Sequence, residues 1–213
     1  AVSLSSDGSI VAIGAYGNNG ANGADTGHVR IYENINNAWI KVGNDIDGEA
    51  ANDKSGSEQS VSLSSDGSVV AIGSYLNDDN GVDSGHVRIF RNYEDAWIQV
   101  GNTLVGEGSN DQSGKAISLS DDGSVVAIGA IYNDGDGTDR GHVRIYQNVD
   151  GTWTKIGDEI KGAISGDHLG NSVSLSSDGS IIAIGAVQND ANTNSNGYVS
   201  VYKNLNNKWT QIG

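Results

Sequence analysis

A four-residue phrase that recurs four times along the chain limits most strongly how this sequence can fold. The phrase reads Ser-Asp-Gly-Ser in three places and Asp-Asp-Gly-Ser in one, and the glycines are 59, 56 and 56 residues apart. All four tryptophans keep the same step, each 12 residues after a glycine: Trp39, Trp97, Trp153 and Trp209. A fixed period of this kind indicates a repeat architecture in which each repeat is one supersecondary unit.

Each repeat is expected to form four short β-strands. In the second repeat, residues 60–64 alternate apolar and polar, and residues 68–73 are apolar on both faces. The Asp-Gly pair between them is a strong hairpin signal, since glycine accepts a positive φ freely. Residues 85–90 and 96–101 supply the third and fourth strands, and no helical periodicity is present. The second strand should therefore be buried on both faces.

Four antiparallel strands repeated about every 56 residues are typical of a β-propeller blade. We predict an all-β fold with four four-stranded blades in a single repeat domain, divided as 1–52, 53–110, 111–166 and 167–213. The blades either close on themselves or belong to a larger ring or array. We favour a larger protein or assembly, because nothing caps either end and the chain opens inside a strand-like run without an initiator methionine.

The order SVSLSSDGSVVAIGS, then GHVRIF, then a tryptophan resembles the FG-GAP repeat, the integrin-like propeller blade found in large secreted proteins of marine bacteria and in some algae. Ser113-Gly114 through Ile117 corresponds to the FG segment, and Ile128-Gly129-Ala130 to the GAP segment. The resemblance covers essentially the whole chain. It implies a propeller fold, an extracellular or cell-surface place, and adhesive or scaffolding work. The family's calcium site does not carry over, because the Ser-Ser-Asp-Gly turn is too short to wrap an ion.

Composition excludes several classes of partner. The 213 residues include 12 basic and 27 acidic side chains, for a formal net charge of −15. Phosphate backbones and anionic lipids attract a positive field, so this charge argues against nucleic acid and membrane surfaces as partners. No apolar run reaches the roughly 18 residues of a membrane-spanning helix. The absence of cysteine excludes disulfides and cysteine zinc sites.

The most reactive-looking side chains recur at equivalent positions, which favours a structural role because architecture repeats in every unit. The histidines follow a glycine at the start of the third strand, and the arginines lie two residues further on the same strand face: His28, His86 and His142; Arg30, Arg88 and Arg144. We interpret them as interblade hydrogen-bonding residues; an anion-binding ring is the alternative. The four tryptophans are interpreted as blade packing, with a sugar-stacking platform as the alternative.

The loop between the second and third strands is the best candidate for a ligand site. Calcium takes six to eight hard oxygen ligands on a path that glycine permits. Two repeats supply such a loop, and their candidate calcium ligands are Asp134, Asp136 and Asp139 in the third repeat and Asp78, Asp79 and Asp83 in the second. The competing interpretation is a loop in which Asn and Asp side chains bond their own backbone.

These observations predict a non-enzymatic structural or adhesive module of an extracellular surface protein or fibre. Its expected partners are other repeats or copies of the same protein, and surface glycans or proteins. The alternative is a calcium-dependent or carbohydrate-binding, lectin-like propeller, with calcium as the only cofactor expected. A third possibility, a hydrolase using the mouth of the propeller, would need a non-repeated carboxylate or histidine in a deep axial pocket. No catalytic set is found in the sequence, so we expect no enzyme.

Overall fold

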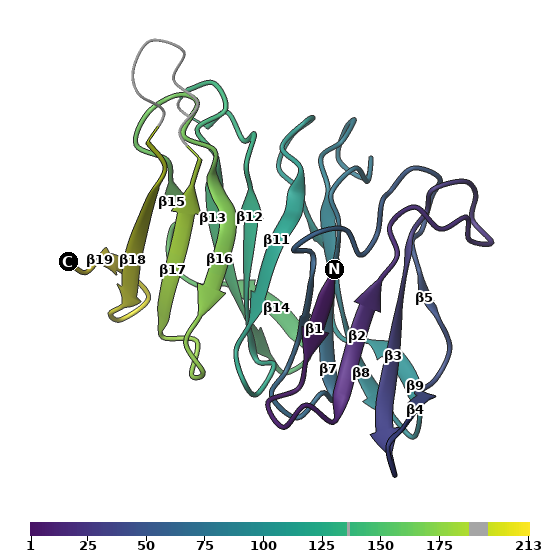
Figure 1. Ribbon diagram of the computed structural model, residues 1–213. Helices are drawn as coiled ribbons and strands as arrows, with labels where there is room; N and C mark the ends of the chain where they lie inside the picture. The colour runs from purple at the N-terminus through teal and green to yellow at the C-terminus, as the bar shows by residue number, and fades with distance from the viewer. Residues whose placement is uncertain (136, 188–195) are drawn as a thin grey trace.

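The computed structural model describes residues 1–135, 137–187 and 196–213, and these residues form strands and turns without a helix. Within this part of the chain there is accordingly no helix long and apolar enough to cross a membrane. Four antiparallel sheets follow one another along the sequence and stand side by side, with the N-terminal and C-terminal sheets at opposite ends (Figure 1). The predicted all-β fold of four propeller blades is confirmed.

Each blade begins at an inner strand and proceeds outward. The first contains β1 (Val2–Leu4), β2 (Ile10–Gly14), β3 (His28–Ile35), β4 (Ala38–Lys41) and β5 (Ile46–Asp47). The second contains β6 (Val61–Leu63), β7 (Val69–Ser74), β8 (His86–Tyr93), β9 (Ala96–Gln99) and β10 (Leu104–Val105). The third contains β11 (Ser113–Leu119), β12 (Val125–Ala130), β13 (His142–Val149), β14 (Thr152–Lys155) and β15 (Ile160–Lys161). The fourth contains β16 (Leu169–Leu175), β17 (Ile181–Ala186), β18 (Tyr198–Asn204) and β19 (Trp209–Gln211).

Three sheets carry a fifth strand that was not expected. The two-residue strands β5, β10 and β15 pair antiparallel with the third strand of their own blade, beyond the point where the fourth strand has left it. They come from the links between repeats, which the sequence predicts only as Gly/Asp/Asn-rich connections. These links therefore run along the third strand and bring their side chains close to the next blade.

The recurrent Ser-Asp-Gly-Ser phrase closes the first hairpin of each blade. In the first blade the Asp7 carboxylate accepts hydrogen bonds from the Ser9 backbone N–H at 2.9 Å and from the Ser5 hydroxyl at 2.8 Å. These bonds lower the pKa of Asp7 to about 2, with the Ser9 backbone bond as the largest cause. Gly8 takes a φ of 73° in this turn, a conformation that glycine adopts without strain.

The core lies between neighbouring sheets. One apolar cluster joins Val69, Val87 and Ile89 of the second blade to Ile128 and Trp153 of the third. Two further clusters link the first blade to the second and the third to the fourth. The strands β7 and β12 are buried along their whole length, whereas β2 of the first blade and β17 of the fourth are only partly buried. The predicted burial of the second strand on both faces thus holds where a blade has two neighbours.

The same backbone contacts recur at every junction between blades. A β-carbon added at Gly14, Gly73 or Gly129 would overlap the carbonyl oxygen of a glycine that leads into the next blade. The recurrent Ile-Gly pair of the second strand therefore permits this approach. Each later tryptophan donates its indole N–H to a carbonyl oxygen of the preceding blade: Trp97 to Val42 at 3.0 Å, Trp153 to Val100 at 2.9 Å and Trp209 to Ile156 at 3.0 Å.

Candidate functional site

The junction between the first and second blades places the repeated histidine and arginine under the preceding link. In β8 the side chains of His86 and Arg88 lie on the same strand face, and both are buried. The Arg88 guanidinium donates a hydrogen bond to the carbonyl oxygen of Asp47 in β5 at 2.7 Å. Arg144 makes the equivalent bond to Val105 at 3.0 Å, while Arg30 in the first blade pairs with Asp45. Arg88 and Arg144 therefore each connect their blade to the link that precedes it, whereas Arg30 pairs with a residue of its own blade.

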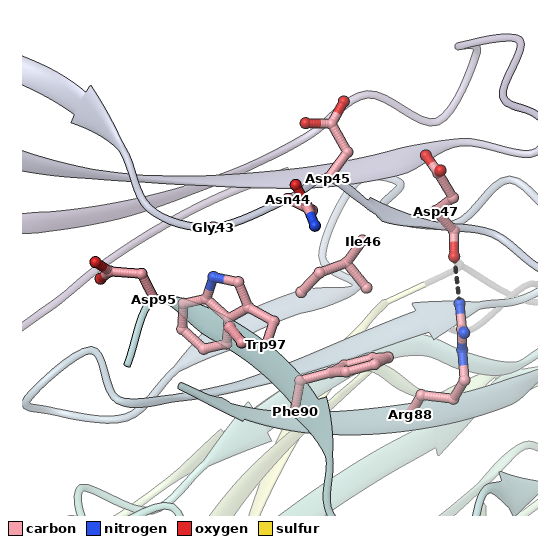
Figure 2. Close-up of a pocket in the computed structure, with 10 residues that line it drawn as sticks. Gly43, Asn44, Asp45, Ile46, Asp47, Arg88, Phe90, Asp95 and Trp97 are labelled. Carbon is pink, nitrogen blue, oxygen red and sulfur yellow. Dashed lines mark hydrogen bonds between the residues drawn. The ribbon is translucent and has the colours of Figure 1, made fainter. Parts of the chain in front are cut away.

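A cavity of about 320 Å³ opens beside Arg88 at this junction. Figure 2 shows the rings of Trp97 and Phe90 on one side of it, and Asn44 and Asp45 on the other. Arg88 reaches across to Asp47 at one end, along the hydrogen bond drawn as a dashed line. The cavity combines an apolar aromatic wall with carboxylate, amide and guanidinium groups. Similar cavities lie at the next two junctions, lined by the later links and by Tyr146 or Tyr202.

Two groups of carboxylates and a histidine come close enough in the described residues to share a metal ion. The first consists of His28, Asp45 and Asp47. Its central carboxylate is already neutralised, because Arg30 contacts Asp45 at 2.8 Å and Lys41 contacts it at 2.6 Å. The hydrogen bond from Arg30 is the largest cause of the lowered pKa of Asp45. This group therefore works as a surface ion-pair network.

The second group is Glu49, Asp79 and His86, whose ligand atoms all lie within 4.8 Å of one another. Glu49 comes from the link after β5, Asp79 from the loop after β7, and His86 from the first position of β8. The imidazole of His86 is fully buried, whereas the two carboxylates are about half exposed. Nη1 of Arg88 lies 3.6 Å from Oε1 of Glu49, and its positive charge balances part of the negative charge of the two carboxylates.

The hydrogen bonding of His86 leaves one ring nitrogen unmatched. Nδ1 lies 2.9 Å from Oδ2 of Asp79, so in the neutral ring the proton belongs on Nδ1. Nε2 then presents a lone pair, is buried and has no hydrogen-bond partner. It faces Oε2 of Glu49, a second acceptor, at 3.7 Å. A buried acceptor that faces a second acceptor is satisfied by a proton or a cation between the two.

The 3.7 Å separation fits two ligands of one metal ion. Zinc binds histidine nitrogen and carboxylate oxygen at about 2.0–2.2 Å, so the tetrahedral angle of about 109° at the ion separates the two ligand atoms by about 3.4 Å. Asp79 would orient the ring from the other side through Nδ1, the usual partner of a metal-ligating histidine. Glu49 and His86 thus provide two direct ligands, and the exposed side faces solvent.

Only the second blade combines these groups in the part of the chain that the structure describes. In the third blade Glu107 approaches His142 at 3.9 Å and Arg144 at 3.3 Å, but Gly135 stands where Asp79 would be. Burial lowers the pKa of His142 to about 3, and the charge of Arg144 adds to this shift. In the fourth blade Tyr198 replaces the histidine, and its hydroxyl donates to Asp167 at 2.8 Å.

Four of the predicted calcium ligands belong to no group of side chains close enough to share a metal ion within the described residues: Asp78, Asp83, Asp134 and Asp139. The Asp78 carboxylate accepts a hydrogen bond from the Asp83 backbone N–H at 2.8 Å, and Asp134 does the same for Asp139 at 3.0 Å. Asp83 and Asp139 have positive φ values of 52° and 51°. The carboxylates of Asp78 and Asp134 therefore each hold the backbone of their own loop, five residues further along the chain. Asp136 lies outside the described residues.

Asp79 is the one predicted calcium ligand that joins a group able to hold a metal, and its neighbours there are Glu49 and His86. The sequence analysis interpreted His86 as an interblade hydrogen-bonding residue because it recurs as His142, and Glu49 was not among its candidates. The signal that could have found the group was Asp79 itself. It has no counterpart in the third repeat, so it adds a non-repeated group to two repeated ones.

No family model matches the sequence, and no curated protein matches it. Solved structures do share the fold. A 6-phosphogluconolactonase structure from Bacteroides uniformis superposes with a TM-score of 0.59 at 16% identity, covering 99% of this chain and 52% of that one. The periplasmic gluconolactonase PpgL of Pseudomonas aeruginosa gives 0.59 at 13% identity, covering 100% and 55%. The β-propeller domain of the Trilobed protease from Pyrococcus furiosus, described as having an open velcro topology, gives 0.52 at 11% identity, covering 100% and 56%.

These likenesses show a β-propeller fold, and the chain spans about half the length of the propellers it matches. They support the propeller part of the FG-GAP resemblance and do not single out that family. The expectation that the chain is not an enzyme was wrong, because two of the propellers with this fold are named as lactonases. The expectation rested on the lack of a catalytic motif in the sequence. Functional side chains on separate blades lie far apart in the sequence, so they can form a site without forming a motif.

Proposed function

We propose that the chain is a propeller module that binds a divalent transition-metal ion at Glu49, Asp79 and His86 and uses that ion to hold a further ligand. The observation that carries this proposal is the buried Nε2 of His86, which lacks a hydrogen-bond partner and faces a carboxylate oxygen at 3.7 Å. A carboxylate cluster on a surface is common, but a buried acceptor aimed into one calls for a proton or a cation between them, and a metal ion is the one that we propose.

The nitrogen ligand decides which metal suits the site. Calcium and magnesium take oxygen ligands, whereas imidazole suits zinc and its first-row neighbours. The calcium expected from the loop carboxylates is therefore replaced, at this site, by an ion such as Zn²⁺. His86 has to be neutral to bind it, and the 2.9 Å contact with Asp79 selects the tautomer that leaves Nε2 free.

The surroundings suggest what the ion would do. The half-exposed carboxylates leave its outer side open to solvent, and an open coordination position takes an oxygen ligand or activates a water molecule. Arg88 links the ion site to the aromatic cavity in Figure 2, since its guanidinium contacts both Glu49 and Asp47. A hydroxylated or carboxylated ligand suits both features. Cation-dependent binding of surface glycans or proteins in an extracellular setting is the biological role that we propose.

Isothermal titration calorimetry with Zn²⁺ on the metal-stripped chain tests the proposal. We expect one site in the wild type, with affinity lowered at least tenfold by Glu49→Gln. The matched control is Glu107→Gln, because Glu107 is the equivalent residue of a blade that lacks the third group, and it contacts Arg144 and Nδ1 rather than Nε2 of His142. Equal affinities for the wild type and Glu49→Gln would overturn the proposal, and so would a titration with no site. A Ca²⁺ titration should show no comparable binding.

A further inference from the structure

The two end blades expose faces that are interior everywhere else in the molecule. At each internal junction one blade offers a tryptophan N–H and the preceding blade offers a backbone carbonyl. The leading face of the first blade and the trailing face of the fourth have no such neighbour in the part of the chain that the structure describes. In Figure 1 these faces belong to the sheets at opposite ends of the row. The four blades thus form an open arc.

The leading face is apolar and hollowed. Trp39 is 47% exposed, although its equivalents Trp153 and Trp209 are buried. It lines a cavity of about 260 Å³ together with Val11, Ile13 and Tyr32. The equivalent residues of the second blade belong to the core between the first two blades: Val70, Ile72, Phe90 and Trp97. The leading face therefore has the side chains of a blade junction without the blade that should cover them.

The trailing face of the fourth blade has the complementary half. Val199 is 70% exposed, whereas its equivalents in the first three blades are 0% exposed: Val29, Val87 and Val143. Val199 borders a cavity of about 360 Å³ that also includes Gly185 and Val187. The carbonyl group of Ile212 is equivalent in the repeat to the carbonyl groups that accept a tryptophan N–H at the three internal junctions.

We infer that a second copy of this chain docks head to tail, with its leading face on the trailing face of the first. The internal junctions specify the contacts by equivalence. Trp39 would donate its indole N–H to the carbonyl oxygen of Ile212, as Trp97 does to Val42. The Leu4 N–H would donate to the Ser174 hydroxyl, as Leu175 does to Ser118. The Ser177 N–H would donate to the Ser6 carbonyl, as Asp121 does to Ser177.

A second copy is the occupant because one chain carries both halves of the same interface. Such an interface is heterologous, and it forms a ring when the rotation between copies closes. Two four-bladed arcs make eight blades, within the range of about 4–8 for propellers. The chain covers 52% and 55% of two solved structures with this fold, so one arc corresponds to about half of such a molecule. The number of blades therefore favours a two-copy ring.

Light scattering coupled to size-exclusion chromatography on the full chain tests this inference. We expect a mass close to twice the 22.0 kDa of one chain, maintained in EDTA because the interface contains no part of the Glu49 site. Val199→Asp should convert the particle to a monomer. Val149→Asp is the matched control, since Val149 is an exposed valine near the hairpin between β13 and β14 and away from both end faces.

The outcomes separate this inference from the proposed function. A 22.0 kDa monomer up to the highest soluble concentration would overturn the second-copy interface and leave the metal site standing. A dimer that Val199→Asp and Trp39→Phe both leave intact would also overturn it, because the association would then use another surface. Loss of zinc binding in the calorimetric test has no bearing on the mass.

Discussion

The indole N–H of Trp97 donates a hydrogen bond to the carbonyl oxygen of Val42, 3.0 Å away in the preceding blade. The bond joins the outer strand of one blade to the chain that leaves the outer strand of the blade before it. Because the tryptophans recur at one step, a single kind of contact sets the outer spacing of all the blades. It also separates the tryptophans into three that bridge two blades and one, Trp39, that makes no such bond within the described residues.

Trp153→Phe should destabilise the fold by about 2 kcal/mol, because it leaves the partly buried carbonyl of Val100 without its donor and removes part of a core ring. Urea unfolding measures the change. Trp39→Phe is the control at concentrations low enough to keep the chain monomeric, and it should change the free energy of unfolding by less than about 0.5 kcal/mol. Equal effects of the two substitutions would contradict the assignment of Trp153 as an interblade bridge.

Gly73→Ala should cost about 3 kcal/mol or prevent folding, because the new methyl group would overlap the backbone carbonyl of Gly114 at the junction. Gly185→Ala is the matched substitution in the last blade. There the methyl group meets the Ser172 hydroxyl, which can rotate away. Thermal unfolding of both variants should give a much lower midpoint for Gly73→Ala. Similar midpoints would show that close approach of neighbouring blades is not what this glycine provides.

Acidification should weaken the fold through His142 before the carboxylates titrate. Burial lowers the pKa of His142 to about 3 from an ordinary value of 6.5, so between these pH values the unfolded chain binds the extra proton. The free energy of unfolding therefore falls as the pH drops, by about 1.6 kcal/mol between pH 6.5 and pH 5, because the slope reaches its full value of about 1.4 kcal/mol per unit only below pH 6.5. The pKa values of Asp7 and Glu159 are lowered to about 2, and their contribution is lost at more acid pH.

The test of this prediction is urea unfolding of the wild type and His142→Gln at pH 6.5 and pH 5. The variant should lose most of the difference between the two pH values, whatever its stability at the higher one. A variant with the full pH dependence of the wild type would assign the effect to other groups.

Zinc should stabilise the folded chain, since a ligand that binds only the native state adds about 2.7 kcal/mol at 100 times its dissociation constant. The thermal midpoint should rise with Zn²⁺ in the wild type and in Asp78→Asn, and much less in Asp79→Asn. Asp78 and Asp79 are adjacent, but only Asp79 contacts His86, at 2.9 Å. An equal rise in both variants would move the metal away from this group.

How much of the site was predictable differs from residue to residue. Asp78 and Asp134 were correctly placed in polar loops, but their carboxylates are used to accept backbone N–H groups of those loops. His86 was recognised as a repeated position and interpreted as an interblade hydrogen-bonding residue, and Glu49 was not among the candidate residues. Their meeting depends on the fifth strand β5, which carries the link across to the next blade. A strand of two residues is too short to show a periodicity in the sequence.

The sequence by itself determined the number of blades, their strands and their turns, because each rests on local signals: alternation of apolar residues, Asp-Gly turns and a constant step between tryptophans. Local chemistry is enough for these features, since a hairpin forms between neighbours in the chain. Only the tertiary structure decided which faces stay uncovered and which side chains meet across a junction. Glu49, Asp79 and His86 come together through the angle at which one sheet packs on the next, a property of two blades at once.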